Sequence, residues 1–480
     1  MAKARIQLGQ AILAEALSTP TMISTDRSDA SSLSLPVLAV IYGGLLSVWA
    51  LTSYYTWPVG ALMVAATFKL TGARLDDFNP ISMATGPRSH KVALLWTVLY
   101  AINLWRRFIE NPEVLAEVSA SDMVDRFNQN LLFKDVMLYL GVANLFLFNR
   151  RHTLSQKMWV FLVALAIYGL ANLALEVFFP DRARIEFGAS RVLGKEGRWS
   201  PALSRSNEVA SSLFMSGASA MAATLAYCVV LKGRESLRLW QFAVMAGAML
   251  VLAYCGYKAE FRGHLLALVS VAGFTVATLF GAGRIVIVTL LVGGAIFPQL
   301  FFGEVGPAVM DALPIDEVLE MIGAKGNRDK TLTGRTDLWY YAGTRLSSVP
   351  EILAVGEGPA LRDASVMEST ALFSGYRMNY HSGMIELLMA NGLPLATAMF
   401  GVLAAAAWGT FANHRGGGKE QIGLFMLLSW LAATLALAFV GPSYAYFETA
   451  VLIVMPLLSA WPRHANAGMG AAACKGHAVA

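Results

Sequence analysis

The chain has 480 residues, of which 56% are hydrophobic and only 14% are charged, and its formal net charge is +5. A soluble domain carries about a quarter charged residues, so this composition excludes an ordinary soluble protein and indicates an integral membrane protein. The three cysteines match no zinc or redox spacing, and two of them, Cys228 and Cys255, fall within predicted spans. A disulfide framework is therefore not expected.

Residues 1–34 do not have the pattern of a cleavable signal peptide. Their apolar stretch, Ala11–Leu17, contains Glu15 and is followed by a segment rich in Ser, Thr and Asp. We predict that these residues form a disordered cytoplasmic tail.

The rest of the chain alternates between apolar runs and short polar stretches. A membrane-spanning helix needs about 20 apolar residues, and helices are expected because they pair every backbone group internally. The sequence thus predicts an all-α membrane fold with about twelve spans, nine within 35–302 and three within 382–461. The predicted spans are 35–54, 56–70, 91–107, 131–148, 157–179, 207–231, 239–257, 264–281, 284–302, 382–412, 421–440 and 443–461.

Basic residues in the short loops predict the orientation of these spans. Lys and Arg are enriched in cytoplasmic loops, and three basic loops fall on one side of the predicted topology together with both termini, including a tail at 462–480. We therefore assign this side to the cytoplasm. The basic residues are Arg150, Arg151 and Lys157, then Lys232, Arg234 and Arg238, and finally Arg415 and Lys419.

Two long segments, 180–206 and 303–381, fall on the opposite, periplasmic side and contain more arginine than lysine. Segment 303–381 includes the apolar stretch Pro307–Leu319, and we expect it to form short helices that cover a cavity and help select a substrate. A guanidinium group presents a planar fork of donors that suits phosphate oxygens. The alternative is that these arginines, among them Arg191, are solvated loop charges or anchors to lipid headgroups.

Three of the arginines lie where the predicted loops meet the membrane: Arg198, Arg262 and Arg335. Ionisable groups at membrane depth are costly and usually face a cavity, so all three are candidates for binding an anion. A simple ion pair between Glu260 and Arg262 is the structural alternative. No metal site is expected, because the carboxylate pair Asp76–Asp77 is predicted to be cytoplasmic and has no third ligand nearby.

His381 stands at the start of the long span 382–412. The positive end of the helix dipole disfavours an imidazolium there, so a neutral ring is expected that can accept a proton from a hydroxyl group. Glu386 lies on a further turn of the same helix and is a candidate supporting residue. A passive contact with a lipid headgroup remains the alternative for His381. Several guanidinium groups and one neutral base fit transfer from a lipid-linked sugar diphosphate without a divalent ion.

Three motifs resemble the O-antigen ligase and polymerase superfamily of bacterial envelope proteins. The first is TGRTDLW, followed by VPEILAVGEGP and then by HSGMIELLMANGLP, which places His381, Gly392 and Pro394 at matching positions. The second is GRWSPALSRSN, which contains Arg198 and Asn207. The third is FRGHLLAL, which contains Arg262. The resemblance extends over roughly residues 190–400.

The resemblance implies a GT-C-like fold and a metal-independent, inverting glycosyl transfer on the periplasmic face of the bacterial inner membrane. The donor would be an undecaprenyl-diphosphate-linked glycan, and the acceptor a sugar of the lipid A core or a growing polysaccharide. His381 would act as the base, while Arg198, Arg262 and Arg335 would stabilise the departing diphosphate. No cofactor and no nucleic-acid partner are expected, and membrane lipids are expected around the spans. Three alternatives remain open: a repeat-unit polymerase of the same superfamily, a transporter of lipid-linked glycans, and an envelope scaffold.

Overall fold

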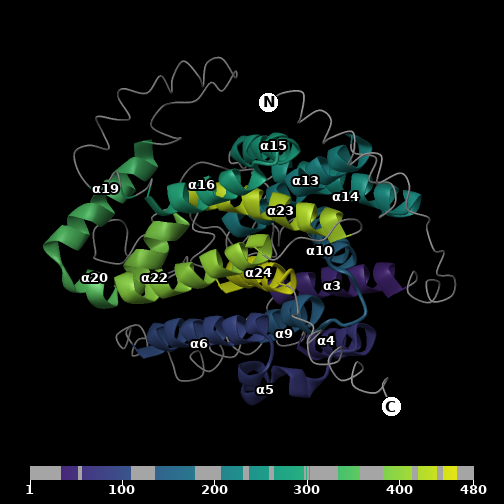
Figure 1. Cartoon of the computed structure of the whole chain (residues 1–480), viewed down its shortest axis with the longest axis horizontal. Helices are drawn as coiled ribbons and strands as arrows, with labels where there is room; N and C mark the ends of the chain where they lie inside the picture. Colours follow the sequence, from purple (N-terminus) through teal and green to yellow (C-terminus); the bar gives the residue numbers. More distant parts are fainter. Residues whose placement is uncertain are drawn as a thin grey trace, which may run out of the picture. The chain divides into compact units, whose positions relative to one another are not determined.

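The structure of the chain is a computed structural model in which every regular element that it describes is a helix (Figure 1). The chain divides into two units, Met1–Val37 and Leu38–Ala480. The described part of the first unit is the beginning of one helix, and all other elements below belong to the second. The described residues are 34–51, 57–109, 136–178, 207–230, 237–258, 264–296, 299, 302, 333–356, 382–412, 420–440 and 447–461.

Each of the twelve ranges predicted from the sequence contains a helix, because each apolar run is long enough for several helical turns. These helices are α3 (Ser34–Leu51), α4 (Trp57–Thr71), α6 (Arg88–Ile109), α9 (Met137–Ala143) with the π-helix η4 (Asn144–Phe148), α10 (Leu154–Phe178), α13 (Asn207–Val230), α14 (Leu239–Lys258), α15 (His264–Leu279), α16 (Gly283–Ile296), α22 (Gly383–Ala412), α23 (Glu420–Val440) and α24 (Phe447–Ser459). Four shorter elements lie between them: η2 (Leu75–Phe78), α5 (Pro80–Thr85), α19 (Thr333–Ser348) and α20 (Glu351–Val355).

Five of these helices, α10, α13, α14, α22 and α23, are long and apolar enough to cross a membrane. The chain is accordingly an α-helical membrane protein. Helices α3, α4, α9 with η4, α15 and α16 contain shorter apolar segments. Twelve crossings and a GT-C-like arrangement therefore remain predictions.

Helix α23 is the most enclosed of the five, since 89% of its apolar window is buried. It packs against α10, α13, α15 and α16. The ring of Trp430 meets Phe161 of α10 edge to face, with ring centroids 5.2 Å apart. Fully buried small residues, Ala432, Ala433 and Ala436, allow the neighbouring helices to approach closely.

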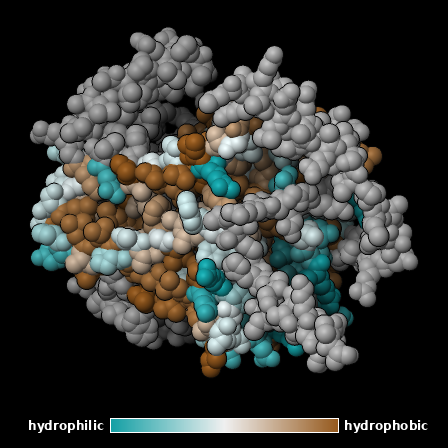
Figure 2. Space-filling view, viewed as in Figure 1, coloured by the Kyte–Doolittle hydropathy of each residue, from teal (hydrophilic) through white to brown (hydrophobic). Residues whose placement is uncertain are grey.

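The surface of the described helices carries many large apolar side chains. In α14 only 33% of the apolar window is buried, and Leu250 is 65% exposed. Figure 2 shows broad, continuous apolar areas on the face that it draws. Apolar areas of this size are unusual on a soluble monomer, whereas hydrocarbon tails cover such areas without cost in a bilayer.

Helix α22 packs against α6 and α24 (Figure 1). The Thr410 hydroxyl donates a hydrogen bond to the carbonyl oxygen of Leu457 in α24 at 2.9 Å. The indole of Trp461, just after α24, donates to the carbonyl oxygen of Ala406 at 2.9 Å. These two bonds attach the second half of α22 to α24 and so fix the helix that begins directly after His381.

Candidate functional site

Helix α22 is broken at Gly392, which has φ 70° and ψ 170°. The break divides the helix into Gly383–Asn391 and Leu393–Ala412, whereas the sequence predicted one span at 382–412. Gly392 adopts the left-handed region that other residues avoid. Pro394 has no N–H group, and its ring displaces the carbonyl of the residue four positions earlier, Ala390. Together these two residues interrupt the hydrogen-bond ladder of the helix.

Helix α20 ends against this break. Gly356 caps the C-terminus of α20. Its N–H donates a hydrogen bond to the carbonyl oxygen of Ile352 at 2.8 Å, and its φ is 78°. A Cβ atom on Gly356 would lie 2.5 Å from the carbonyl carbon and oxygen of Ala390, and a Cβ atom on Gly392 would lie 2.8 Å from the carbonyl of Ala354. The two chain segments therefore touch through their backbones, at a distance that only glycine allows.

Helix α19 also packs against α20 and α22. It begins at Thr333, within the segment 303–381 where the sequence predicted short helices, and its buried face includes Trp339 and Ala342. Arg335 lies in the first turn of this helix, but its side chain is outside the described residues. The packing of α19, α20 and α22 thus brings together three helices that are separate in the sequence.

The first half of α22 has a buried polar face. Ser382 and Glu386 are one turn apart, and they are 0% and 3% exposed. The Glu386 N–H donates to the Ser382 carbonyl oxygen at 2.8 Å, which places Ser382 at the N-cap position, directly before the first helical residue Gly383. Among the described residues, the Ser382 hydroxyl has no hydrogen-bond partner. A buried polar atom left unpaired costs about 1–3 kcal/mol, so a bound group that pairs with this hydroxyl would be stabilised.

Another part of α22 is apolar and borders a cavity of about 30 Å³ between α6, α22 and α24. Met384 and Leu387 of α22 contribute to its wall together with Trp96 of α6, whose ring stacks on Tyr100 at a centroid distance of 5.6 Å. A cavity of this volume has room for about one water molecule. Its lining is apolar and does not include Ser382 or Glu386, so the cavity is separate from the buried polar face of α22.

Only Glu386 of the eight predicted site residues has a described side chain. Asn207 is the first residue of α13, and its side chain, like that of Arg335, is not described. His381, Arg191, Arg198, Arg262 and Glu260 lie outside the described residues.

Ser382 and the contact between Gly356 and Gly392 were not predicted from the sequence. The signal for Ser382 was its position next to His381, and the signal for the break was a glycine two residues before a proline. In the described ranges, no group of three His, Cys, Asp or Glu is placed to hold a metal ion. Asp77, one of the two adjacent carboxylates noted in the sequence, pairs instead with Arg150 at 2.8 Å.

A scan against protein-family models finds no match to the chain, and a search of curated proteins finds no significant match.

Proposed function

We propose that the chain is a membrane glycosyltransferase of the O-antigen ligase class. It would move a glycan from an undecaprenyl-diphosphate donor to an acceptor hydroxyl on the periplasmic face of the bacterial inner membrane. The observation that supports this proposal is the packing of α19 and α20 against α22. Each of these three helices contains described residues of one of the stretches on which the strongest part of the family resemblance depends.

The proposed reaction is a direct displacement at the anomeric carbon. A bond forms between the acceptor oxygen and that carbon, the bond to the diphosphate oxygen breaks, and the acceptor proton passes to His381. Arg198, Arg262 and Arg335 compensate the charge of the departing diphosphate, as guanidinium forks do for phosphate oxygens. Attack from the side opposite the leaving group inverts the configuration. Since arginine supplies the positive charge, a chelator is expected to leave transfer largely unchanged.

Ser382 and Glu386 add two polar groups that the acceptor sugar can contact. A buried carboxyl group in a membrane helix is costly and marks a functional position by default. Ser382 follows His381 directly, and Glu386 lies one helical turn after Ser382. A hydroxyl and a carboxyl on one helix turn can bind neighbouring sugar hydroxyls and so orient the acceptor.

The same site serves either a ligase or a repeat-unit polymerase, because both use the same donor. In a ligase the acceptor is a sugar of the lipid A core, and in a polymerase it is the non-reducing end of another lipid-linked repeat unit. The predicted periplasmic segment 303–381 contains α19 and α20, and we assign the choice of acceptor to this segment.

A transporter of lipid-linked glycans is the second candidate, and the break in α22 favours it. Transporters commonly contain discontinuous membrane helices whose broken ends bind substrate. The two candidates differ in their product, since a transporter moves the donor across the bilayer and forms no glycosidic bond.

Proteoliposomes that contain the purified chain, a polyprenyl-diphosphate-linked glycan and an acceptor lipid would test the proposal. The wild type is expected to form the glycosylated acceptor, and His381→Ala is expected to abolish this product while donor binding persists. His464→Ala, in the predicted C-terminal tail, is the matched control. Full turnover by His381→Ala would show that this residue is not the base. Donor movement across the bilayer without any product would favour the transporter.

A further inference from the structure

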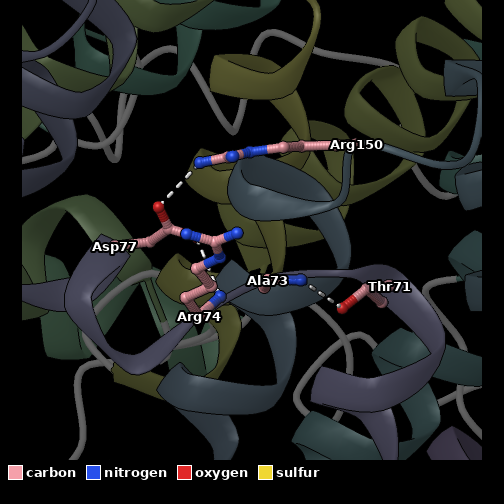
Figure 3. Close-up of polar contacts among 5 residues, drawn as sticks. All are labelled: Thr71, Ala73, Arg74, Asp77 and Arg150. Carbon is pink, nitrogen blue, oxygen red and sulfur yellow. Dashed lines mark hydrogen bonds and ion pairs between the residues drawn. The ribbon is translucent and has the colours of Figure 1, made fainter.

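Two segments that are far apart in the sequence meet where α4 ends and α10 begins (Figure 3). The first contains η2 and α5 and connects α4 to α6, and the second is the turn Asn149–Thr153. The Arg150 guanidinium forms an ion pair with Asp77 at 2.8 Å, and the Arg151 guanidinium donates to the carbonyl oxygen of Lys69 at 3.0 Å. The sequence predicted both segments on the cytoplasmic side, and their contact agrees with a common side.

A buried hydrogen-bond network holds this junction in place. The Asn144 amide donates to the Thr67 hydroxyl at 2.7 Å, and the Thr71 hydroxyl donates to the Asn144 carbonyl oxygen at 2.5 Å. All three residues are fully buried. From η2, Phe78 also packs inward on Phe148, with ring centroids 4.4 Å apart. The outward side chains of the two segments are therefore presented from a well-anchored backbone.

The exposed side of the junction is strongly basic. Within 69–91 and 149–152 there are six exposed Lys and Arg side chains against two acidic ones, and Asp77 is already paired with Arg150. Helix α6 begins with Arg88 and has no acidic residue in its first turn. Cations at the positive end of a helix dipole are unfavourable, so this end of α6 would be stabilised by an anion. The six basic residues are Lys69, Arg74, Arg88, Lys91, Arg150 and Arg151.

The same segment exposes two large apolar side chains outside the apolar helices. Leu75 is 74% exposed and Ile81 is 73% exposed, one on either side of the inward-facing Phe78. Contact with water is unfavourable for both side chains, whereas the boundary between headgroups and acyl chains accommodates apolar residues next to basic ones. This pattern distinguishes a lipid from a free phosphate, which has no apolar part.

We propose that this junction binds the headgroup of an anionic phospholipid, with Arg74, Arg88 and Lys91 on the phosphate and Leu75 and Ile81 against the acyl chains. We call it the junction surface. Basic pockets beside membrane helices on the cytoplasmic side have the chemistry for such headgroups. The junction surface is distinct from the proposed transferase site at α22 and does not depend on it.

Titration of the full-length, detergent-solubilised chain with short-chain phosphatidylglycerol tests this proposal, with the shift of the thermal unfolding midpoint as the measurement. Phosphatidylglycerol is expected to bind more tightly than phosphatidylcholine of equal chain length. Arg74→Gln combined with Lys91→Gln should weaken binding by about 30-fold, since each basic residue near an anionic lipid contributes about fivefold. The combination Leu75→Ser and Ile81→Ser should weaken binding of both lipids while the preference for phosphatidylglycerol over phosphatidylcholine persists, because the basic residues are unchanged.

Two exposed arginines elsewhere, Arg238 and Arg284, provide a control with the same charge change, and their double glutamine variant should bind like the wild type. Glycerol phosphate at the same concentration should shift the midpoint little. Equal binding of both lipids by the wild type would overturn the proposal, and this comparison needs no variant. An equal loss in the control variant, or an equal effect of glycerol phosphate, would also overturn it.

Discussion

Gly356 and Gly392 meet backbone to backbone, so that a Cβ atom on Gly392 would lie 2.9 Å from the amide nitrogen of Gly356. Both residues have positive φ, 78° and 70°. One ends α20 and the other breaks α22, and each forms part of a stretch that resembles the glycan ligase and polymerase superfamily. A close approach of two glycines thus explains why glycine is needed at two positions 36 residues apart in the printed sequence.

Gly392→Ala is expected to lower the free energy of unfolding by at least about 2 kcal/mol. An alanine at positive φ costs about 1–2 kcal/mol, and its methyl group would overlap Ala354 and Gly356. Gly401→Ala in the same helix is the control, because nothing lies within 4 Å of its added Cβ. There we expect a gain of roughly 0.5–1 kcal/mol. Similar stabilities for both variants, measured by denaturant unfolding in detergent, would contradict the described contact.

Glu386→Gln is expected to reduce glycosyl transfer by about 10²-fold or more if the carboxyl group orients or deprotonates the acceptor. The substitution keeps the shape of the side chain, so the unfolding midpoint should change little. Glu351→Gln, at the exposed start of α20, is the control. Turnover and midpoint should be measured on the same preparations. Normal turnover of Glu386→Gln would remove this residue from the proposed site.

Asn144→Leu should destabilise the chain by about 1–3 kcal/mol, because it deletes two buried hydrogen bonds between η4 and α4. Asn172→Leu is the matched control. The Asn172 amide donates only within its own helix, to Tyr168 at 2.9 Å, and its carbonyl oxygen has no partner among the described residues. We expect a smaller loss there than for Asn144→Leu, because that substitution deletes no hydrogen bond between helices. A reversed order of the two variants in an unfolding titration would argue against the network.

The stability of the chain should decrease as the pH falls from 6.5 towards 4. Burial lowers the pKa of His152 to about 4, and the charges of Lys157 and Arg151 act in the same direction. The unfolded chain, with an ordinary histidine pKa near 6.5, binds more protons than the folded chain in this window, so protonation favours unfolding. His152→Gln should flatten this part of the curve of unfolding midpoint against pH. An unchanged slope in the variant would assign the effect to other groups.

The positions of the helices could be predicted closely from the sequence. Spans predicted at 207–231 and 239–257 correspond to helices Asn207–Val230 and Leu239–Lys258. Apolar runs of this length, bounded by charged residues, leave the backbone few alternatives in a membrane. The end of the predicted span 284–302 was less accurate, since α16 ends at Ile296. Apolarity alone does not indicate where a helix stops.

The candidate site was only partly predictable. Glu386 was named from its spacing behind His381, and its burial agrees with a position inside the helix bundle. The break at Gly392 was not predicted, because Gly and Pro are also tolerated within continuous membrane helices. What makes the left-handed backbone favourable is the contact with Gly356, and that contact comes from a distant part of the chain.

By itself, the sequence determined that this is a membrane protein made of helices, and it located those helices, because hydrophobicity and backbone pairing act over neighbouring residues. Only the tertiary structure decided that Arg150 pairs with Asp77, that Asn144 joins two threonines of α4, and that α20 closes on the break in α22. Each of these contacts links residues separated by more than 30 positions. Such pairings depend on how whole helices pack, which no local pattern of residues specifies.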